Sequence, residues 1–366
     1  MNYRFSNPGS CATALVMGAV AGLIYLIIYP PNAPSEMWIT TDPGSYYRMA
    51  GHPFRPEYLP FVLRPAIPLI VRAIPLPTCW SFAVLNVLSL ALLTALVERL
   101  GALLSRPVSV RLGAGALVCT ILPVSGAFRV PAMIDIPVLC LVVGTVLSVH
   151  AGLIRIGFIL TIFSAFSHPL GFMMGLGVLA SRSRKVALTS AALGVALLTG
   201  YYFLMGDRIL PYRYAPKPSV VFQGTAILRS VLTTLVYSIG PLPVGLAVAP
   251  RTYRRLVSYC LFGIVVAIAG ASAWGRFLGF LCPLLAPLAL HKVTSSSPVA
   301  IISRWLLFPV AMIATGSLFL LPNTVPLWTP PSKMAGGILL ILSAAAISCS
   351  CFLEKHRAGL CPSLKE

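Results

Sequence analysis

Residues 156–180 read IGFILTIFSAFSHPLGFMMGLGVLA, and Ser167-His168-Pro169 interrupts this apolar run near its middle. Pro169 has no backbone N–H to donate, and it disfavours helix in the residue before it. The pattern therefore predicts a pair of short helices that dips into a membrane and returns, in place of one straight span. Irregular backbone at membrane depth occurs only inside protein or beside water, so the pair is also a candidate cavity wall.

The charges that flank the other apolar runs agree with counting this broken pair as two crossings. Cytoplasmic loops of membrane proteins carry an excess of Lys and Arg. With the N-terminus in the cytoplasm and each span crossing in turn, that side receives 16 of the 27 basic residues. A single span over 156–180 would move Arg182, Arg184 and Lys185 to the opposite side. The sequence thus predicts a cytoplasmic N-terminus and a cytoplasmic tail at 354–366.

The composition also indicates a membrane protein: 58% of the residues are hydrophobic and only 10% are charged, against about 25% charged in soluble domains. We expect one all-α membrane domain over 1–366, a polytopic helical bundle with about eleven spans of roughly 20 residues each. Besides the broken pair, the candidate spans are 11–30, 80–97, 113–128, 134–153, 187–206, 226–249, 256–272, 277–291, 305–321 and 334–353.

An outer loop and an interfacial helix are expected between the first two spans, at 31–79. Thr41-Asp42-Pro43 is a good helix start, because Asp can cap a helix and Pro suits its first turn. The run 61–74 is too short for a span and fits a helix lying at the interface. In such a helix Arg64 and Arg72, eight residues apart, would share one face toward water or phosphate.

The carboxylates are unevenly distributed. We place five of the eight at the outer side: Glu36, Asp42, Glu57, Asp135 and Asp207. The other three, Glu98 among them, lie beside cytoplasmic basic residues and are interpreted as ordinary solvated charge. In a loop over a membrane cavity, Asp42 could be a general base or a metal ligand, or simply a helix cap. Glu57 is a weaker second candidate, with a solvated loop residue as the alternative.

Three further residues could take part in a site. Asp135 stands at the outer end of a span, where an ionisable group normally faces the protein interior or a cavity; it could equally be a cap or a partner of Arg129. His168, at the break, could bind phosphate or relay a proton, or be a satisfied buried histidine. Arg276 could hold a phosphate through two hydrogen bonds or snorkel to the interface.

Several function classes are excluded or disfavoured. The sequence has no P-loop, no GxGxxG in a strand–helix context, no HExxH and no GxSxG elbow. Its nine cysteines form neither a CxxC motif nor a zinc spacing. The basic excess is explained by topology and lipid phosphates, so nucleic acid is not an expected partner.

The order of short motifs over residues 11–290 points to a family. After the first span come Asp42-Pro-Gly-Ser-Tyr46-Tyr47-Arg-Met-Ala50, Pro53-Phe54 and Leu63-Arg64-Pro65-Ala-Ile-Pro68-Leu69. Later come Asp135-Ile-Pro137, a pair of short helices, and Arg276-Phe277-Leu278 leading to Pro283-Leu284-Leu285. In this order of motifs the chain resembles the GT-C glycosyltransferase superfamily of bacterial polytopic membrane proteins.

The resemblance implies a reaction. In that superfamily an acidic residue of the first outer loop is catalytic, and the donor is usually a sugar on a polyprenyl phosphate. Asp42 would then deprotonate or orient the acceptor hydroxyl, and Arg64 and Arg276 would neutralise the lipid phosphate leaving group. His168 stands where related sequences often have an acidic residue. The loop has no Asp-Asp or Asp-x-Asp pair, so no cofactor is expected and a divalent metal has no paired-carboxylate motif to support it.

Two other functions stay open: a transporter or flippase for a lipid or polar solute, and a non-catalytic membrane assembly partner. A transporter predicts internal symmetry and paired charges at the midplane, and neither is clear in the sequence. The enzyme predicts a bacterial inner-membrane protein whose partners are membrane lipid and a polyprenyl-phosphate-linked sugar. It also predicts that Asp42, Arg64, Asp135, His168 and Arg276 converge on one outer cavity.

Overall fold

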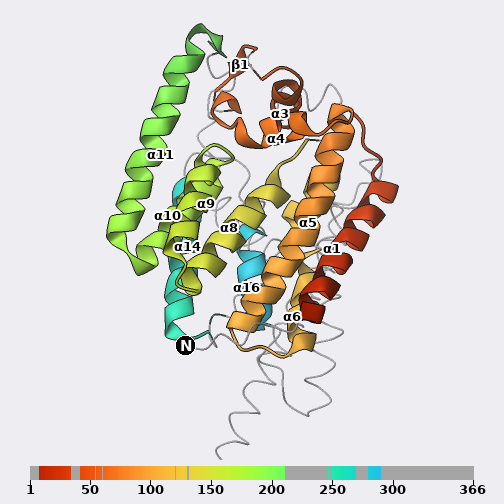
Figure 1. The fold of residues 1–366 in the computed structure, drawn as a ribbon, viewed down its shortest axis with the longest axis vertical. Helices are drawn as coiled ribbons and strands as arrows, with labels where there is room; N and C mark the ends of the chain where they lie inside the picture. The colour runs from red at the N-terminus through yellow and green to blue at the C-terminus, as the bar shows by residue number, and fades with distance from the viewer. Residues whose placement is uncertain are drawn as a thin grey trace, which may run out of the picture.

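The computed structural model describes residues 8–33, 42–53, 55–59, 61–119, 121–129, 132–210, 246, 249–268 and 279–289. Within these ranges the chain is mostly helical, as predicted (Figure 1). Two short strands, β1 (Glu57–Tyr58) and β2 (Ile209–Leu210), pair in parallel. The predicted spans 305–321 and 334–353, most of 226–249 and the tail at 354–366 lie outside the described residues.

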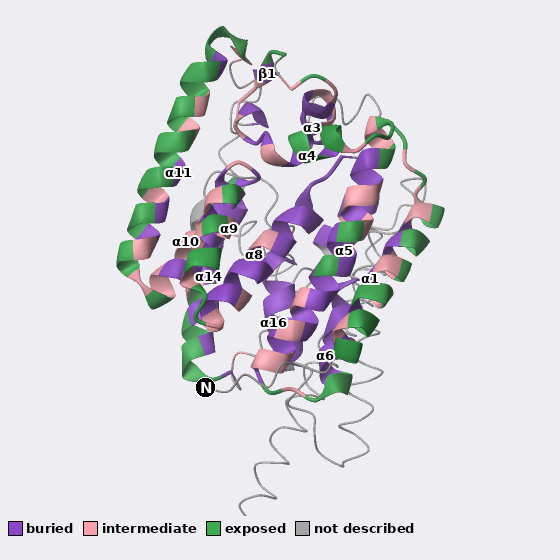
Figure 2. Ribbon diagram, viewed as in Figure 1, coloured by how far each residue is buried: buried purple, intermediate pink, exposed green. Residues whose placement is uncertain are grey.

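In the described part of the chain, three helical segments are long and apolar enough to cross a membrane. They are α1 (Pro8–Ile28), α5 (Thr78–Leu103) and the segment Arg184–Arg208, which contains α11 (Arg184–Met205). α1 and α11 flank the bundle and expose apolar side chains on their outer faces (Figure 2). Exposed apolar faces on long helices are typical of membrane spans.

The other helices of the bundle are shorter: α6 (Val108–Val118), α7 (Leu122–Arg129), α8 (Asp135–His150), α9 (Ile154–Ala165), α10 (Pro169–Arg182), α14 (Arg251–Ile268) and α16 (Cys282–Ala289). The prediction of one span over 113–128 is wrong, because α6 ends at Val118 and α7 begins at Leu122. Pro123, in the first turn of α7, cannot donate the backbone hydrogen bond that a continuous helix would need. The total of about eleven spans stays a prediction.

The broken pair is confirmed. α9 and α10 run antiparallel, since Gly157 lies near Leu179 and Gly175 packs on Thr161. The three residues 166–168 join them. The chain therefore reverses direction at the break, and the turn after α10 lies away from α3 (Asp42–Gly51) and α4 (Ala66–Ala73) (Figure 1). That the pair crosses a membrane twice stays a prediction.

Two ends of the bundle can thus be distinguished. The loop end holds α3, α4, β1, β2 and the 3-10 turn η1 (Phe61–Leu63). The basic end holds the α5–α6, α8–α9 and α10–α11 turns and the start of α14 (Figure 1). Basic residues predicted to share one side of a membrane lie in these turns or in the helix ends beside them: Arg106, Arg111, Arg155, Arg182, Arg184, Lys185, Arg251, Arg254 and Arg255.

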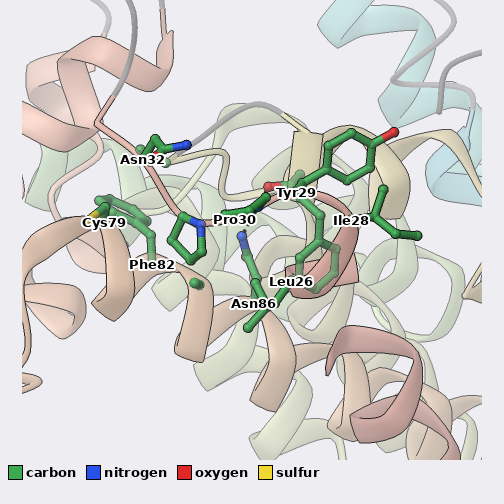
Figure 3. A pocket seen from close by; sticks show the side chains of 13 residues that line it. Leu26, Ile28, Tyr29, Pro30, Asn32, Cys79, Phe82 and Asn86 are labelled. Atoms are coloured by element: carbon green, nitrogen blue, oxygen red, sulfur yellow. Dashed lines mark hydrogen bonds between the residues drawn. The ribbon is translucent and has the colours of Figure 1, made fainter. Parts of the chain in front are cut away.

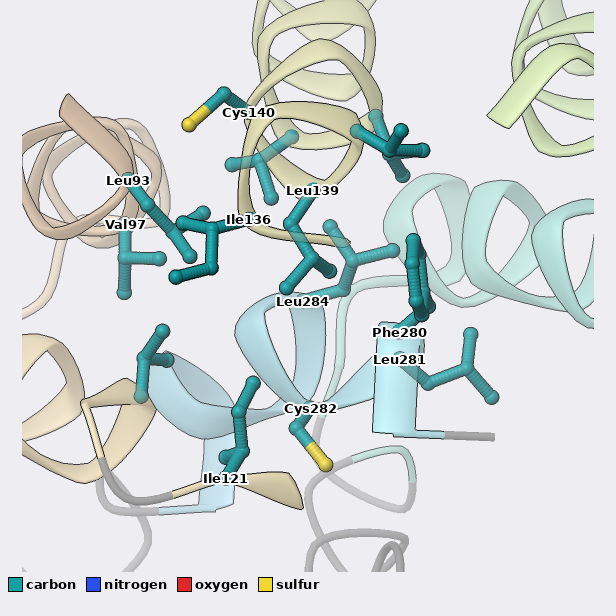
Figure 4. Close-up of a cluster of buried hydrophobic side chains, with 14 of the residues drawn as sticks. Leu93, Val97, Ile121, Ile136, Leu139, Cys140, Phe280, Leu281, Cys282 and Leu284 are labelled. Carbon is teal, nitrogen blue, oxygen red and sulfur yellow. The ribbon is translucent and has the colours of Figure 1, made fainter. Parts of the chain in front are cut away.

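Close helix contacts and a central short helix form the core. A Cβ on Gly18 of α1 would come within 2.7 Å of the Ala91 Cα of α5, and the Thr94 hydroxyl donates to the Ala14 carbonyl at 2.7 Å. α16 lies in the middle of the bundle. Its buried side chains pack against Leu93 and Val97 of α5 and Ile136 and Leu139 of α8 (Figure 4).

A buried ion pair at the basic end corrects one sequence interpretation. Glu98 is not solvated: its side chain is 0% exposed, and Arg111 Nη1 lies 3.1 Å from its Oε1. The Ser10 hydroxyl donates to the same oxygen at 2.7 Å. The interpretation failed because Glu98 lies on the α5 face that α1 and α6 cover, and its sequence neighbours gave no sign of that packing.

Candidate functional site

Arg64 lies at the centre of the loop end, between η1 and α4. Its side chain is buried, and its Nη1 donates a 2.8 Å hydrogen bond to the Tyr46 hydroxyl. Its Cζ lies 5.4 Å from the centroid of the Phe61 ring. Tyr46 is also fully buried and meets Phe61 edge-on. These contacts hold the Arg64 guanidinium beside α3. Its positive charge is permanent, because an arginine does not deprotonate in proteins.

The predicted interfacial helix over 61–74 is only partly correct. α4 covers Ala66–Ala73, and Arg64 stands before it because Pro65 disfavours helix in the preceding residue. Arg72, by contrast, is exposed on α4 and donates to the Gly51 carbonyl at the end of α3. The prediction that Arg64 and Arg72 share one helix face is therefore wrong.

The break between α9 and α10 touches the Arg64 segment directly. The backbone N–H of Ala66 donates to the carbonyl of Phe166 at 3.1 Å. His168, two residues further, is buried and caps α10: its Nδ1 accepts from the Leu170 N–H at 3.2 Å. Because Nδ1 accepts, the proton of the neutral ring is assigned to Nε2. The donor side of the neutral His168 ring is thus Nε2.

Asp135 lies at the same end of the bundle as His168. It is buried and is the first residue of α8. The first turns of α8 and α10 pack side by side, since a Cβ on Gly171 would come within 2.9 Å of Val138 Cγ1. Two helix N-termini, each with a partial positive charge, therefore lie next to each other.

Asn86 of α5 fixes the connection that leads into α8. Its side-chain amide lies within hydrogen-bonding distance of two carbonyls, 3.3 Å from Ala127 O and 3.4 Å from Met133 O. The second of these precedes Asp135 by two residues, so Asn86 helps to position that carboxylate. Asn86 was not predicted as a site residue, although a polar asparagine within the apolar run 80–97 indicates a buried hydrogen-bonding role.

Glu57 has a structural task, and its interpretation as a solvated loop residue is wrong. Arg48 binds it through two hydrogen bonds of 2.8 Å, from Nε to Oε2 and from Nη2 to Oε1. The Ser45 hydroxyl and the Tyr58 N–H also donate to Oε1. These bonds tie β1 to α3. Contact of Glu57 with a substrate has no support from this geometry.

The remaining predicted residues are placed only in part. Asp42 is the first residue of α3, as the Thr41-Asp42-Pro43 pattern predicts, but its side chain lies outside the described part of the structure. Arg276 falls in the undescribed range 269–278. Among the described residues no group of three His, Cys, Asp or Glu side chains could hold a metal ion.

A cavity of about 220 Å³ opens near the loop end, between the end of α1 and the start of α5 (Figure 3). Its wall is mostly apolar, with Tyr29, Asn32 and Asn86 as polar members. None of the five predicted site residues whose side chains the structure describes lines it. In the described part of the chain, the cavity and the Arg64–His168 region are therefore separate features, and Asn86 lines the cavity while its amide contacts the connection before Asp135.

Comparison with known proteins adds no relative to this picture. No protein-family model, no curated protein and no solved structure matches the chain. The geometry of the loop end is consequently the basis on which a function can be argued.

Proposed function

We propose that the chain is a membrane-embedded glycosyltransferase that uses a sugar linked to a polyprenyl phosphate and acts at its loop end. One observation carries the proposal: the Ala66–Phe166 hydrogen bond joins the Arg64 segment to the helix break at His168. With the packed first turns of α8 and α10, this contact supports placing Arg64, His168 and Asp135 in one region; the enzyme hypothesis requires that Asp42 and Arg276 lie there too.

The charges of this region suit a phosphate. Arg64 has five N–H donors, and a guanidinium can bind two phosphate oxygens at once. The proton of the neutral His168 ring lies on Nε2, and the N-terminus of α10 adds a favourable dipole, while the Leu170 N–H is already bonded to His168 Nδ1. Tyr46 and Phe61 keep Arg64 in place, so little reorganisation is needed when a negative charge develops. Arg276 would be a second phosphate ligand.

The proposed step is a displacement at the anomeric carbon. The acceptor oxygen forms a bond to that carbon, and the bond from carbon to the phosphate oxygen breaks. The electron pair leaves with the polyprenyl phosphate, whose negative charge Arg64 and His168 stabilise. The acceptor proton passes to Asp42, the proposed general base at the start of α3. Such a base typically contributes 10²- to 10⁴-fold to the rate.

The test is donor turnover by the purified full chain in lipid nanodiscs. A panel of polyprenyl-phosphate-linked sugars is supplied with membrane-extract acceptors, and released polyprenyl phosphate is measured by mass spectrometry. Asp42→Asn should stop release while the protein elutes and unfolds like the unmodified chain. Unchanged release by Asp42→Asn, or no release from any donor by the unmodified chain, contradicts the proposal. Donor that crosses a membrane intact would support the flippase alternative.

A further inference from the structure

The basic end carries a dense group of cations, here called the basic patch. Its members are Arg182, Arg184 and Lys185 in the α10–α11 turn and Arg251, Arg254 and Arg255 in the first turns of α14. All six side chains are exposed. The proposed transfer reaction uses none of them, so the patch needs its own explanation.

Two glycines fix the halves of the patch relative to each other. A Cβ on Gly263 of α14 would come within 2.6 Å of the Met173 carbonyl oxygen of α10, and a Cβ on Gly177 of α10 would come closer still to the Tyr259 carbonyl oxygen. This contact sets the register of α10 against α14. As a result, Arg184 and Arg255 both interact with the Tyr259 hydroxyl, and Arg255 Cζ lies 5.8 Å from the Tyr259 ring centroid.

Carboxylates are scarce around the patch. The sequence contains no Asp or Glu from 136 to 206 or from 208 to 353, so the helices that carry the patch supply no acid to neutralise it. Glu98, which the structure describes at the same end, is buried with Arg111. Exposed cations on neighbouring helices repel one another, and a bound anion would relieve that repulsion.

The patch continues into apolar surface on both helices. On α11, Leu188 follows Arg184 by one turn and is 70% exposed. On α14, Arg255, Tyr259 and Phe262 share one face by their spacing, and Phe262 is 67% exposed. A molecule that fits both parts has an anionic head and an apolar tail. Tyr259 lies between the two parts, where tyrosines commonly mark a membrane interface.

We propose that the basic patch binds the headgroups of anionic phospholipids, with their acyl chains along Leu188 and Phe262. Guanidinium groups match phosphate oxygens through paired hydrogen bonds, and clustered basic residues attract anionic lipids. An acidic soluble protein would match the cations but not the adjoining apolar faces. The inference is independent of the proposed transfer reaction.

The experiment measures lipid binding to the purified full chain by native mass spectrometry, with phosphatidylglycerol and phosphatidylcholine as competing probes. The test variant is Arg184→Gln/Arg255→Gln. The matched control is Arg55→Gln/Arg208→Gln, which removes two exposed arginines from the loop end. The test variant should lose on the order of thirtyfold in relative affinity for phosphatidylglycerol, since each basic contact contributes roughly fivefold. The relative affinity of the control variant for phosphatidylglycerol should change less than twofold.

Two further arms keep the outcome decisive. Arg184→Lys/Arg255→Lys should retain most of the preference for phosphatidylglycerol over phosphatidylcholine, because it keeps both charges. That result would show that the loss in the Gln variant does not come from misfolding. Glycerol 3-phosphate, a headgroup without tails, should compete poorly. Equal loss in the test and control variants, no loss in either, or full displacement by millimolar glycerol 3-phosphate overturns the proposal.

Discussion

Each end of the bundle buries a carboxylate with an arginine, but the two pairs are built differently. At the loop end, Arg48 and Glu57 share two hydrogen bonds of 2.8 Å, and the Arg48 side chain is 41% exposed. At the basic end, one 3.1 Å contact joins Glu98 and Arg111, whose side chains are 0% and 7% exposed. Oε2 of Glu98 and Nε of Arg111 have no hydrogen-bond partner among the described residues.

We propose that the two ends differ in role, with the basic end serving structure and the loop end carrying the proposed chemistry. Ser10, Glu98 and Arg111 come from α1, α5 and α6, so the basic-end pair joins three helices inside the protein. At the loop end the charges lie on short elements and helix starts, where Arg48 is partly exposed and Glu57, Arg64 and Asp135 are buried. The loop-end pair therefore keeps one partner in contact with solvent, whereas the basic-end pair is enclosed by helices.

The largest expected effect follows from breaking the basic-end pair. Glu98→Gln leaves the Arg111 charge buried without a counter-ion, which should lower the free energy of unfolding by about 3–5 kcal/mol. The measurement is reversible SDS unfolding in mixed micelles. A loss well below 1 kcal/mol would show that water or another group already compensates Arg111.

A double variant sharpens the same point. Glu98→Leu/Arg111→Met removes both charges together, and an apolar replacement of a buried pair is often neutral or stabilising. Most of the lost stability should therefore return. If the double variant is as unstable as Glu98→Gln, packing and not charge accounts for the first result.

The loop-end pair should cost less to break. Glu57→Gln removes a charged acceptor from four hydrogen bonds, but the partly exposed Arg48 can turn toward water. We expect a loss of about 2 kcal/mol, confined to the loop end. Hydrogen exchange should accelerate in α3 and β1 and stay unchanged in α5. Uniform acceleration through the bundle would contradict the proposed independence of the two ends.

A smaller effect is expected for the partner of Arg64. Tyr46→Phe removes the hydroxyl that accepts from Nη1 and should destabilise the protein by about 1 kcal/mol. Donor turnover should fall more than stability does, because Arg64 becomes less well fixed for phosphate. Tyr47→Phe, a neighbouring tyrosine on the same helix, is the matched control and should leave turnover nearly unchanged.

The smallest effect is expected for Arg72→Gln. Arg72 is exposed and donates to a backbone carbonyl at the end of α3, so water can replace the lost donor. Unfolding and turnover should both stay within experimental error, as for most surface substitutions. A large loss of turnover would return Arg72 to the phosphate site.

Local chemistry explains which parts of the fold could be predicted from the sequence. Pro169 predicted the α9–α10 break, and Asp42-Pro43 predicted the start of α3, because proline limits its own backbone and that of its neighbour. Pro65 limits helix in the same way, and it excludes Arg64 from α4. The prediction placed Arg64 in that helix because it relied on the eight-residue spacing between Arg64 and Arg72. The division of 113–128 was missed although Pro123 stood inside it.

Packing explains what the sequence could not predict. Glu98 looks like any charge near a helix end, and only the arrangement of α1, α5 and α6 shows that it is buried. The Arg48–Glu57 pair depends on the fold of the loop, since nine residues separate its members. The proximity of Arg64 and His168 depends on the Ala66–Phe166 contact, which joins segments a hundred residues apart.

The central claim is that the loop end performs the chemistry and that the basic-end pair serves structure. Donor turnover per folded molecule, compared between Asp42→Asn and Glu98→Leu/Arg111→Met, tests it most directly. We predict a loss of at least about 100-fold for Asp42→Asn and turnover within twofold of the unmodified chain for the double variant. Normal turnover in Asp42→Asn together with loss in the folded double variant would contradict the claim.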